Sequence, residues 1–459
     1  MTNVNSVISS LKRNSWLVFA TTVFIIVYIC ICVASYRFVE LGGVAISELR
    51  SNLGFLLVSL TVSVALFGYV QLFWLKPKWP EKFSLVALVP CGLFVLAFIQ
   101  TYTGEWWFKS YGDHGTLSTA INESKPYTRW LFGTSAMIDV FGLVNHFLVS
   151  ISSQQFVHIA SAACMCMSTV LLTRRFGAKA SVILPCTTPI WIAFSLGYDE
   201  YYPFIAGIFL LLALWVFSEC DFGVSNTLYA IAGVLPALYV GFVPLTIFVL
   251  AKLFIKTISV KTWFSGVTIS SLAYLVAIEF AWPAGHSNYL AVLSDSMNLG
   301  DTRNIHNYQG TTMSSKLPFY SFQSAFSPSH LSDLLFVGFF AGGIATIALV
   351  FFVGHSMQLG VFKGENKIGN LKHVATLPMV FITWNLLYLL FMIPKLGPVA
   401  DIDLFFASNL TIAIWAGIVL ERIFEFRKSK IQERANVLGA IVSLNGPIVA
   451  VLVIYGIRR

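Results

Sequence analysis

Residues 53–75 read LGFLLVSLTVSVALFGYVQLFWL and are followed by the cations Lys76 and Lys78. This run has no charged residue and matches the roughly 20 apolar residues that a helix needs to cross a bilayer. Further apolar runs bounded by charge lie near 16–36, 83–100, 155–172, 181–197, 203–219, 227–240, 242–255, 264–282, 332–354, 374–393, 405–420 and 436–457. The pattern predicts an all-α, polytopic transmembrane protein of about 11–13 spans.

The composition of the chain agrees with this prediction. Of its 459 residues, 57% are hydrophobic and 11% are charged, and the mean hydropathy is +0.78. A soluble domain normally carries about 25% charged residues, so the composition argues against a soluble globular protein. The formal net charge of +8 includes no run of Lys and Arg typical of a nucleic-acid-binding tail, and no nucleic-acid partner is predicted.

The stretch 227–255 is too long for one span and too short for two full ones. Pro236 and Pro244 each lack a backbone N–H, so we expect a pair of short, broken helices there. Such helices need surrounding protein to satisfy their free backbone groups.

Charges predict the orientation of the chain. Lys12 and Arg13 precede a first apolar run that lacks a small-residue cleavage site, which favours a retained signal anchor and a cytoplasmic amino terminus. Alternating sides at every segment places 19 of the 29 Lys and Arg residues in the cytoplasm and 14 of the 21 acids outside. The cytoplasmic cations are Lys12, Arg13, Lys76, Lys78, Lys82, Arg174, Arg175, Lys179, Lys252, Lys256, Lys261, Lys363, Lys367, Lys372, Arg422, Arg427, Lys428, Lys430 and Arg434.

Two long connections, 101–154 and 283–331, fall on the outer side in this topology. Both are rich in Trp, Tyr, Ser, Asn and Gly, so we expect folded loops. Residues 131–151 mix apolar side chains with Asp139, Asn145 and His146, a pattern that suits a helix lying in the membrane interface better than a span.

Four short acidic sequences lie at the predicted outer ends of spans. They are GDHG at 112–115, GYDEYYP at 197–203, SPSHLSD at 327–333 and GPVADIDLF at 397–405. Adjacent carboxylates near the hydrocarbon edge are costly unless they are paired, hydrated or functional. Plain alternatives are an aspartate in a glycine-flanked turn, an aromatic belt, and helix capping by Ser329, Ser332 or the acids of the last sequence. Together the four sequences predict an acidic cavity at the outer membrane boundary.

At these positions the chain resembles the multi-spanning bacterial glycosyltransferases of the C-type superfamily (GT-C). The resemblance covers most of the chain in layout and implies a single transmembrane domain over 1–459 in a bacterial inner membrane. It implies transfer of a sugar from a polyprenyl-phosphate carrier to a glycan, lipid or protein acceptor at the non-cytoplasmic face, with inversion at the anomeric carbon.

By motif matching, the resemblance implies Asp113 as the catalytic base. Asp199 and Glu200 are expected to orient the acceptor or replace the base. We expect phosphate binding by Arg129 and His330, and a remaining substrate site made by Trp106, Tyr201, Asp333, Asp401 and Asp403. His114 stands where the commoner pattern has a second acid, which leaves open both the base and a divalent cation as cofactor.

Three rival interpretations stay open. A secondary transporter or flippase would bind protons or cations at the outer acids and substrate at the broken helices, although Glu279 is the nearest approach to a mid-membrane acid. An O-antigen polymerase or ligase is expected to use arginines in large outer loops, where only Arg129 and Arg303 stand. In a non-catalytic scaffold, substitution of the polar outer residues would affect assembly.

Overall fold

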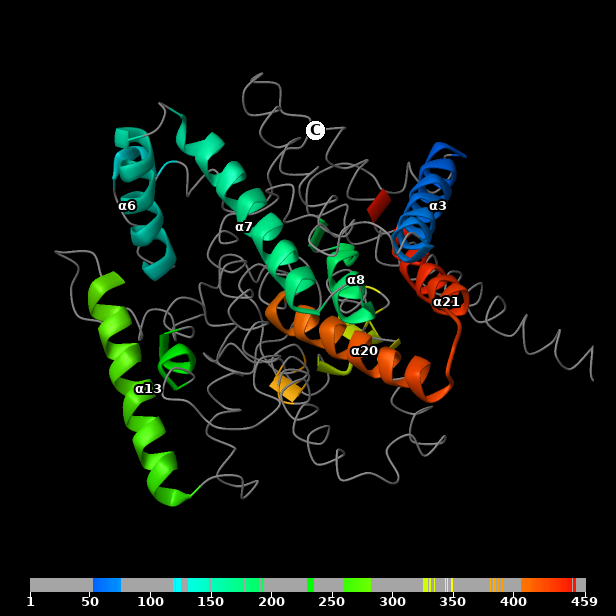
Figure 1. Cartoon of the computed structure of the whole chain (residues 1–459). Helices are drawn as coiled ribbons and strands as arrows, with labels where there is room; N and C mark the ends of the chain where they lie inside the picture. Colours follow the sequence, from blue (N-terminus) through cyan, green and yellow to red (C-terminus); the bar gives the residue numbers. More distant parts are fainter. Residues whose placement is uncertain are drawn as a thin grey trace, which may run out of the picture.

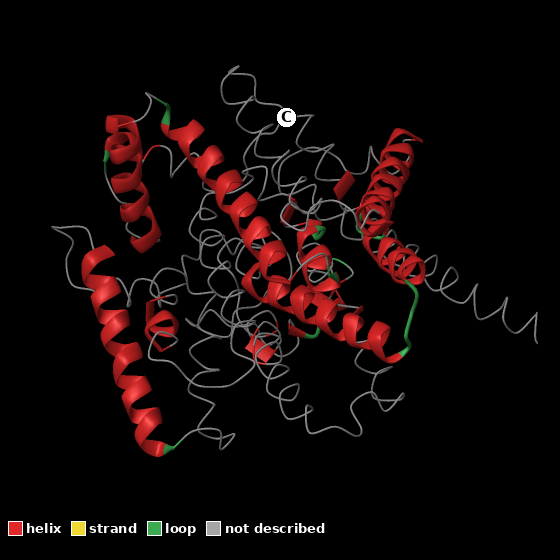
Figure 2. Ribbon diagram, viewed as in Figure 1, coloured by secondary structure: helices red, strands yellow, loops and turns green. Residues whose placement is uncertain are grey.

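The computed structural model describes a set of separate helices and helix ends. The described residues are 53–75, 119, 121–124, 131–147, 151–176, 179–189, 191–192, 229–234, 259–281, 325–328, 330–331, 334, 343, 345, 348–349, 380, 383–384, 387, 390, 406–447 and 449–450. All the regular elements among them are helices, and no strand occurs in these ranges (Figure 2). The predicted all-α class is confirmed for this part of the chain. Within it, no helix was found that is long and apolar enough to cross a membrane.

Helix α3, Leu53–Leu75, packs along α21, Ile431–Ser443 (Figure 1). Glycines on the carboxyl-terminal side allow the close approach: a Cβ on Gly439 would lie 2.8 Å from the Phe67 ring, and one on Gly446 would collide with Ser63. Toward the end of α3, the Gln71 side chain donates to Asn436 Oδ1 at 3.1 Å and accepts from Gln432 Nε2 at 3.2 Å. The end of α3 therefore lies beside the start of α21.

The most buried element is α8, Ala180–Cys186, whose seven residues are all buried. It packs on α20, Phe406–Phe426, where the absence of a side chain at Gly417 lets that helix contact the backbone of Ser181. On another side α8 meets α7, Ser153–Phe176, and Cys186 Sγ lies 3.8 Å from Thr169 Oγ1. Small residues at such contacts let helix backbones come close.

Helix α6, Leu131–Phe147, occupies most of the segment in which the sequence predicts an interfacial helix. Its inner side packs with Ile138, Phe141 and Val144 against Phe156 and Val157 of α7. The rings of Phe141 and Phe156 meet edge to face with centroids 5.4 Å apart, and the Ile151 N–H donates to Asn145 Oδ1 at 3.0 Å across the connection. The outer side of α6 leaves Val140, Leu143 and Phe147 exposed.

Helix α13, Val260–Ala281, packs against the helical residues 229–234. Ser270 Oγ donates to the Tyr229 carbonyl oxygen at 2.6 Å, and the Tyr229 ring lies directly on Gly266. Gly233 in turn packs on the Ser270 backbone, so the two segments are in close contact around Ser270. The predicted broken pair 227–255 is described only over this first helical part.

Several helices expose broad apolar faces. On α3, Leu57, Leu60 and Val64 are exposed at the spacing of one helical side, and on α13 the exposed side chains include Phe264, Leu272, Leu275 and Val276. A monomeric soluble protein rarely leaves such large contiguous apolar surface in contact with water. These faces are expected to contact something other than water.

Candidate functional site

The predicted acidic cavity lies almost entirely outside the described residues. Of the ten predicted site residues, only His330 is described. The other nine lie outside the described residues: Trp106, Asp113, Arg129, Asp199, Glu200, Tyr201, Asp333, Asp401 and Asp403. Among the described residues no group of His, Cys, Asp and Glu gathers in a way that would hold a metal ion. Of the four acidic sequences, only Ser327, Pro328, His330 and Leu331 are described.

His330 lies in a short helical turn that begins at Ser327. The His330 N–H donates to Ser327 Oγ at 3.3 Å, and the Leu331 N–H donates to the Ser327 carbonyl oxygen at 2.9 Å. Ser327 therefore caps this turn, in the role that the sequence suggested for Ser329 or Ser332. The His330 side chain is 2% exposed, so its imidazole belongs to the protein interior.

A buried polar junction forms where residues of three predicted segments meet. The Asn445 side chain donates from Nδ2 to the Thr187 carbonyl oxygen at 2.9 Å, across a separation of 258 residues. Gly343 adopts φ +56°, and a Cβ there would come within 2.6 Å of Asn445 Oδ1 and 3.1 Å of Pro189. Thr187, Gly343 and Asn445 are all buried. We call these three residues and Pro189 the junction.

Two of these segments are interrupted beside the junction for a local reason. Helix α8 contains Pro185 and ends at Cys186, where the Thr187 hydroxyl donates back to the Ile183 carbonyl at 2.7 Å. The Thr188 hydroxyl donates to the Pro185 carbonyl at 2.8 Å. Helix α21 ends at Ser443, and a turn at residues 444–445 follows it. The sequence predicts single segments over 181–197 and 436–457, so both interruptions were missed.

Two sequence signals mark these interruptions. Thr187, Thr188 and Pro189 follow one another, and hydroxyls that bond back to a helix together with a proline without an N–H weaken helix continuation. Asn445 is followed by Gly446 and Pro447, a pairing typical of turns. A buried asparagine inside an apolar run also calls for a partner.

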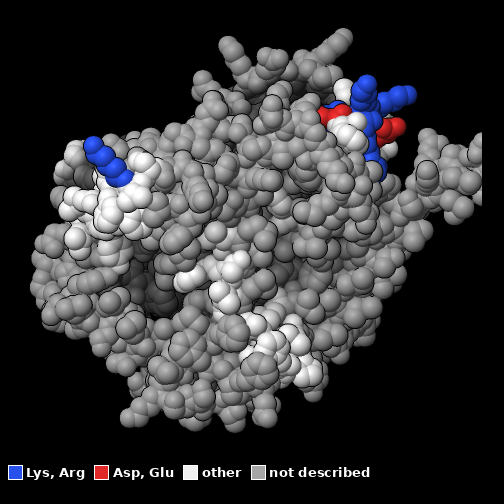
Figure 3. Space-filling view, turned by 90° about the horizontal axis from the view of Figure 1, so that it is seen from below, with Lys and Arg blue, Asp and Glu red and all other residues white. Residues whose placement is uncertain are grey.

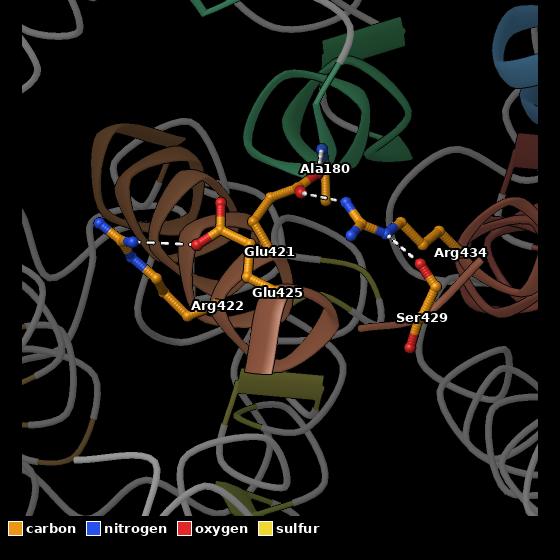
Figure 4. A network of polar contacts seen from close by, with 6 residues as sticks. All are labelled: Ala180, Glu421, Arg422, Glu425, Ser429 and Arg434. Atoms are coloured by element: carbon orange, nitrogen blue, oxygen red, sulfur yellow. Dashed lines mark hydrogen bonds and ion pairs between the residues drawn. The ribbon is translucent and has the colours of Figure 1, made fainter. Parts of the chain in front are cut away.

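A second polar network holds the opposite end of α8 (Figure 4). Glu421 of α20 accepts from the Ala180 N–H at 2.7 Å, and its other carboxylate oxygen lies 3.9 Å from Arg434. Arg434 also donates from Nε to the Ser429 carbonyl oxygen at 3.0 Å and lies over the Phe424 ring. A carboxylate at a helix amino terminus accepts a hydrogen bond from a free N–H and interacts favourably with the positive end of the helix dipole.

The electrostatics of Glu421 are set by its burial. Burial raises the pKa of this carboxyl above its ordinary value, and repulsion from Glu425 adds to the rise. The Ala180 hydrogen bond and the charges of Lys179 and Arg434 lower the pKa, but they do not reverse the shift. The charge pattern places Glu421 among the acids of the cytoplasmic side, and its position directly after the apolar run 405–420 is the sequence signal for this contact.

The buried helix α8 is thus held by a hydrogen bond at each end. Glu421 binds the backbone at its start, and Asn445 binds the backbone just beyond its end. Comparison with known proteins adds no family to this picture. No protein-family model, no curated protein and no solved structure matches the chain.

Proposed function

We propose that this chain is an integral membrane glycosyltransferase that moves a sugar from a polyprenyl-phosphate carrier to an acceptor at the non-cytoplasmic face. The protein lies in a bacterial inner membrane, with its amino terminus on the cytoplasmic side. This proposal builds on the GT-C resemblance, and the observation that carries it is the way in which helix ends pair.

Helix ends that the charge pattern assigns to the same side lie together. Gln71, near the predicted cytoplasmic end of one span, bonds to Asn436 at the cytoplasmic start of another. Ala180, at a predicted cytoplasmic start, bonds to Glu421 at a cytoplasmic end. These pairings are consistent with the alternation of sides that the charge pattern predicts, and they support the proposed orientation.

The exposed apolar faces support the membrane setting. Leu57, Leu60 and Val64 of α3 and the exposed side of α13 form the surface that hydrocarbon tails would cover without cost. In water, each large side chain of this kind forgoes about 1.5–3 kcal/mol of burial free energy. A lipid environment removes that penalty.

Alternation then puts the acids of all four short sequences on the outer side. In the proposed reaction, the Asp113 carboxylate removes the proton of an acceptor hydroxyl as its oxygen bonds to the anomeric carbon. The bond from that carbon to the carrier phosphate oxygen breaks, and the phosphate leaves with the electron pair. Arg129 offsets the charge on the leaving phosphate as the sugar passes through an oxocarbenium-like state. His330, which is buried in the described structure, joins Arg129 only if substrate binding exposes its imidazole.

The first test is mass spectrometry of surface glycans and lipid-linked sugars from cells that lack the protein. Wild type is expected to restore a missing sugar substituent. Asp113→Asn at matched expression should leave the substituent missing, and the polyprenyl-phosphate-linked sugar should accumulate. Glu123→Gln, another acid of the same loop, serves as the control and should restore the sugar. Rescue by Asp113→Asn would remove this residue from the mechanism.

A second candidate function is transport or flipping of a polar or lipid-linked substrate. The junction favours it, because Pro189, Gly343 and Asn445 lie near the middle of their predicted segments. Interrupted helices that meet at mid-membrane are a feature of transporter substrate sites. Unchanged glycans in the deletion strain, together with lost uptake or flipping in Asn445→Ala, would favour this function over transfer.

A further inference from the structure

The connection between α20 and α21 gathers positive charge at the surface. Residues 426–431, which we call the basic tip, are Phe426, Arg427, Lys428, Ser429, Lys430 and Ile431. Figure 3 shows Lys and Arg side chains grouped on the face seen from below, at the place of this connection. All residues of the tip except the half-buried Ser429 are exposed.

The acids nearest the tip are already engaged. Glu425 pairs with Arg422 at 2.9 Å, and Glu433 accepts from the Lys430 backbone N–H at 3.1 Å. Glu421 is buried against α8 and faces Arg434. Lys428 and Lys430 form no ion pair with any of the residues that the structure describes. Their charges are therefore available to an external anion.

The backbone places one of these lysines where a lysine is strained. The Ser429 N–H donates to the Phe424 carbonyl at 3.0 Å and the Lys428 N–H to the Glu425 carbonyl at 3.1 Å, the Schellman pattern of a helix end. Lys428 occupies the left-handed position of this motif with φ 51°. Glycine is the usual residue there, so the lysine is kept at a conformational cost.

Apolar side chains stand on both sides of these cations. Phe426 is 54% exposed and Ile431 is 58% exposed. Phe426 follows the last residue of the apolar run 405–420 by six positions, which is about 9 Å along a helix. In the proposed membrane setting, this distance places both side chains at the level of the cytoplasmic headgroups.

We propose that the basic tip is a binding surface for the phosphate groups of anionic phospholipids in the cytoplasmic leaflet. Lys428 and Lys430 attract the headgroup phosphate, and Phe426 and Ile431 enter the acyl-chain boundary beside it. Basic residues close to such a leaflet gain energy from its negative surface potential, and apolar neighbours add affinity. The tip would fix the level of α20 and α21 in the bilayer. This inference rests on the membrane placement but not on glycosyl transfer.

The test measures lipid retention by the purified full-length protein in detergent. Native mass spectrometry follows titration with phosphatidylglycerol or with phosphatidylcholine of the same acyl chains. Wild type is expected to prefer phosphatidylglycerol. Lys428→Gly should weaken that binding about fivefold per lost charge, and addition of Lys430→Gln should weaken it further. Lys428→Arg, which keeps the positive charge at the same position, is the matched control and should change binding less than twofold.

The glycine variant separates charge from folding. Because glycine tolerates the backbone of position 428, Lys428→Gly should raise thermal stability while it lowers lipid affinity. Phe426→Ser with Ile431→Ser should weaken binding without abolishing the preference for the anionic lipid.

Three results would overturn the proposal. The first is equal retention of the two lipids by wild type. The second is unchanged phosphatidylglycerol binding in Lys428→Gly with Lys430→Gln. The third is that inorganic phosphate or a polyglutamate peptide occupies the tip without displacing phosphatidylglycerol, which would mean that the lipid binds elsewhere. Failure of glycosyl transfer would leave these readouts unchanged, so the two proposals fail separately.

Discussion

Gly343 is the residue at which the junction tolerates no side chain. Its φ of +56° is costly for an L-residue, and a Cβ would press on Asn445 Oδ1 at 2.6 Å. Buried Asn445 is held by Thr187, so it has little freedom to move aside. The position therefore combines backbone strain and overpacking.

Gly343→Ala should destabilise the protein by about 2–5 kcal/mol, the sum of a left-handed alanine and an overpacked contact. The measurement is thermal unfolding in detergent, with Gly68→Ala as the control because a Cβ at Gly68 meets nothing within 4 Å. Equal melting temperatures for the two variants would show that the junction can relax.

Glu421 gives a second residue-scale prediction, on pH. Its folded pKa is raised above the ordinary 4.5 by burial, so the folded state holds the proton more tightly than the unfolded state. Its contribution to stability is full below pH 4.5 and is lost as pH rises through the raised folded pKa. Glu421→Gln cannot ionise and keeps an oxygen for the Ala180 N–H.

Thermal unfolding between pH 4.5 and neutrality should therefore show a smaller loss of stability in Glu421→Gln than in wild type. Glu433→Gln, at an exposed glutamate of α21, controls for the removal of one negative charge. If the Glu421→Gln and Glu433→Gln curves coincide, burial of Glu421 does not govern this pH dependence.

At the scale of elements, the exposed sides of α3 and α13 are what the membrane proposal explains. Val64 lies on the outer side of α3, whereas Val70 of the same helix is fully buried. Two valines on one helix thus face different surroundings. Their difference can be measured directly.

A spin label at Val64→Cys, in a background without native cysteines, should be accessible to oxygen and protected from a water-soluble nickel chelate. These probes partition oppositely between hydrocarbon and water, because oxygen is apolar and the chelate is polar. A label at exposed Glu433→Cys should show the reverse pattern. Strong nickel accessibility at Val64 would place this face in water.

At the scale of the whole molecule, the paired helix ends make the topology testable. Lys428 and Asp139 are both exposed, and the proposal puts them on opposite sides of the membrane. A membrane-impermeant maleimide added to intact cells should label Asp139→Cys and should label Lys428→Cys only after the cells are opened. The reverse order would invert the topology and move the acidic sequences to the cytoplasm.

For the residues that the structure describes, the sequence by itself determined the helical class and the approximate positions of most helices. The run 53–75 coincides with α3, and the run 264–282 begins four residues after the start of α13 and ends one residue after its end. A long apolar run must satisfy its backbone groups internally, and a helix does so. His330 could be placed at a helix start from its neighbouring serines. Its degree of burial could not.

Only the tertiary structure decided the polar attachments of α8. Glu421 and Asn445 are separated from their α8 partners by 241 and 258 residues, and no local pattern encodes such pairs. The ends of α8 depend on these partners because the helix is too short to be stable alone and its free N–H and C=O groups are buried. The sequence supplied the buried polar residues, and packing chose which backbone groups they satisfy.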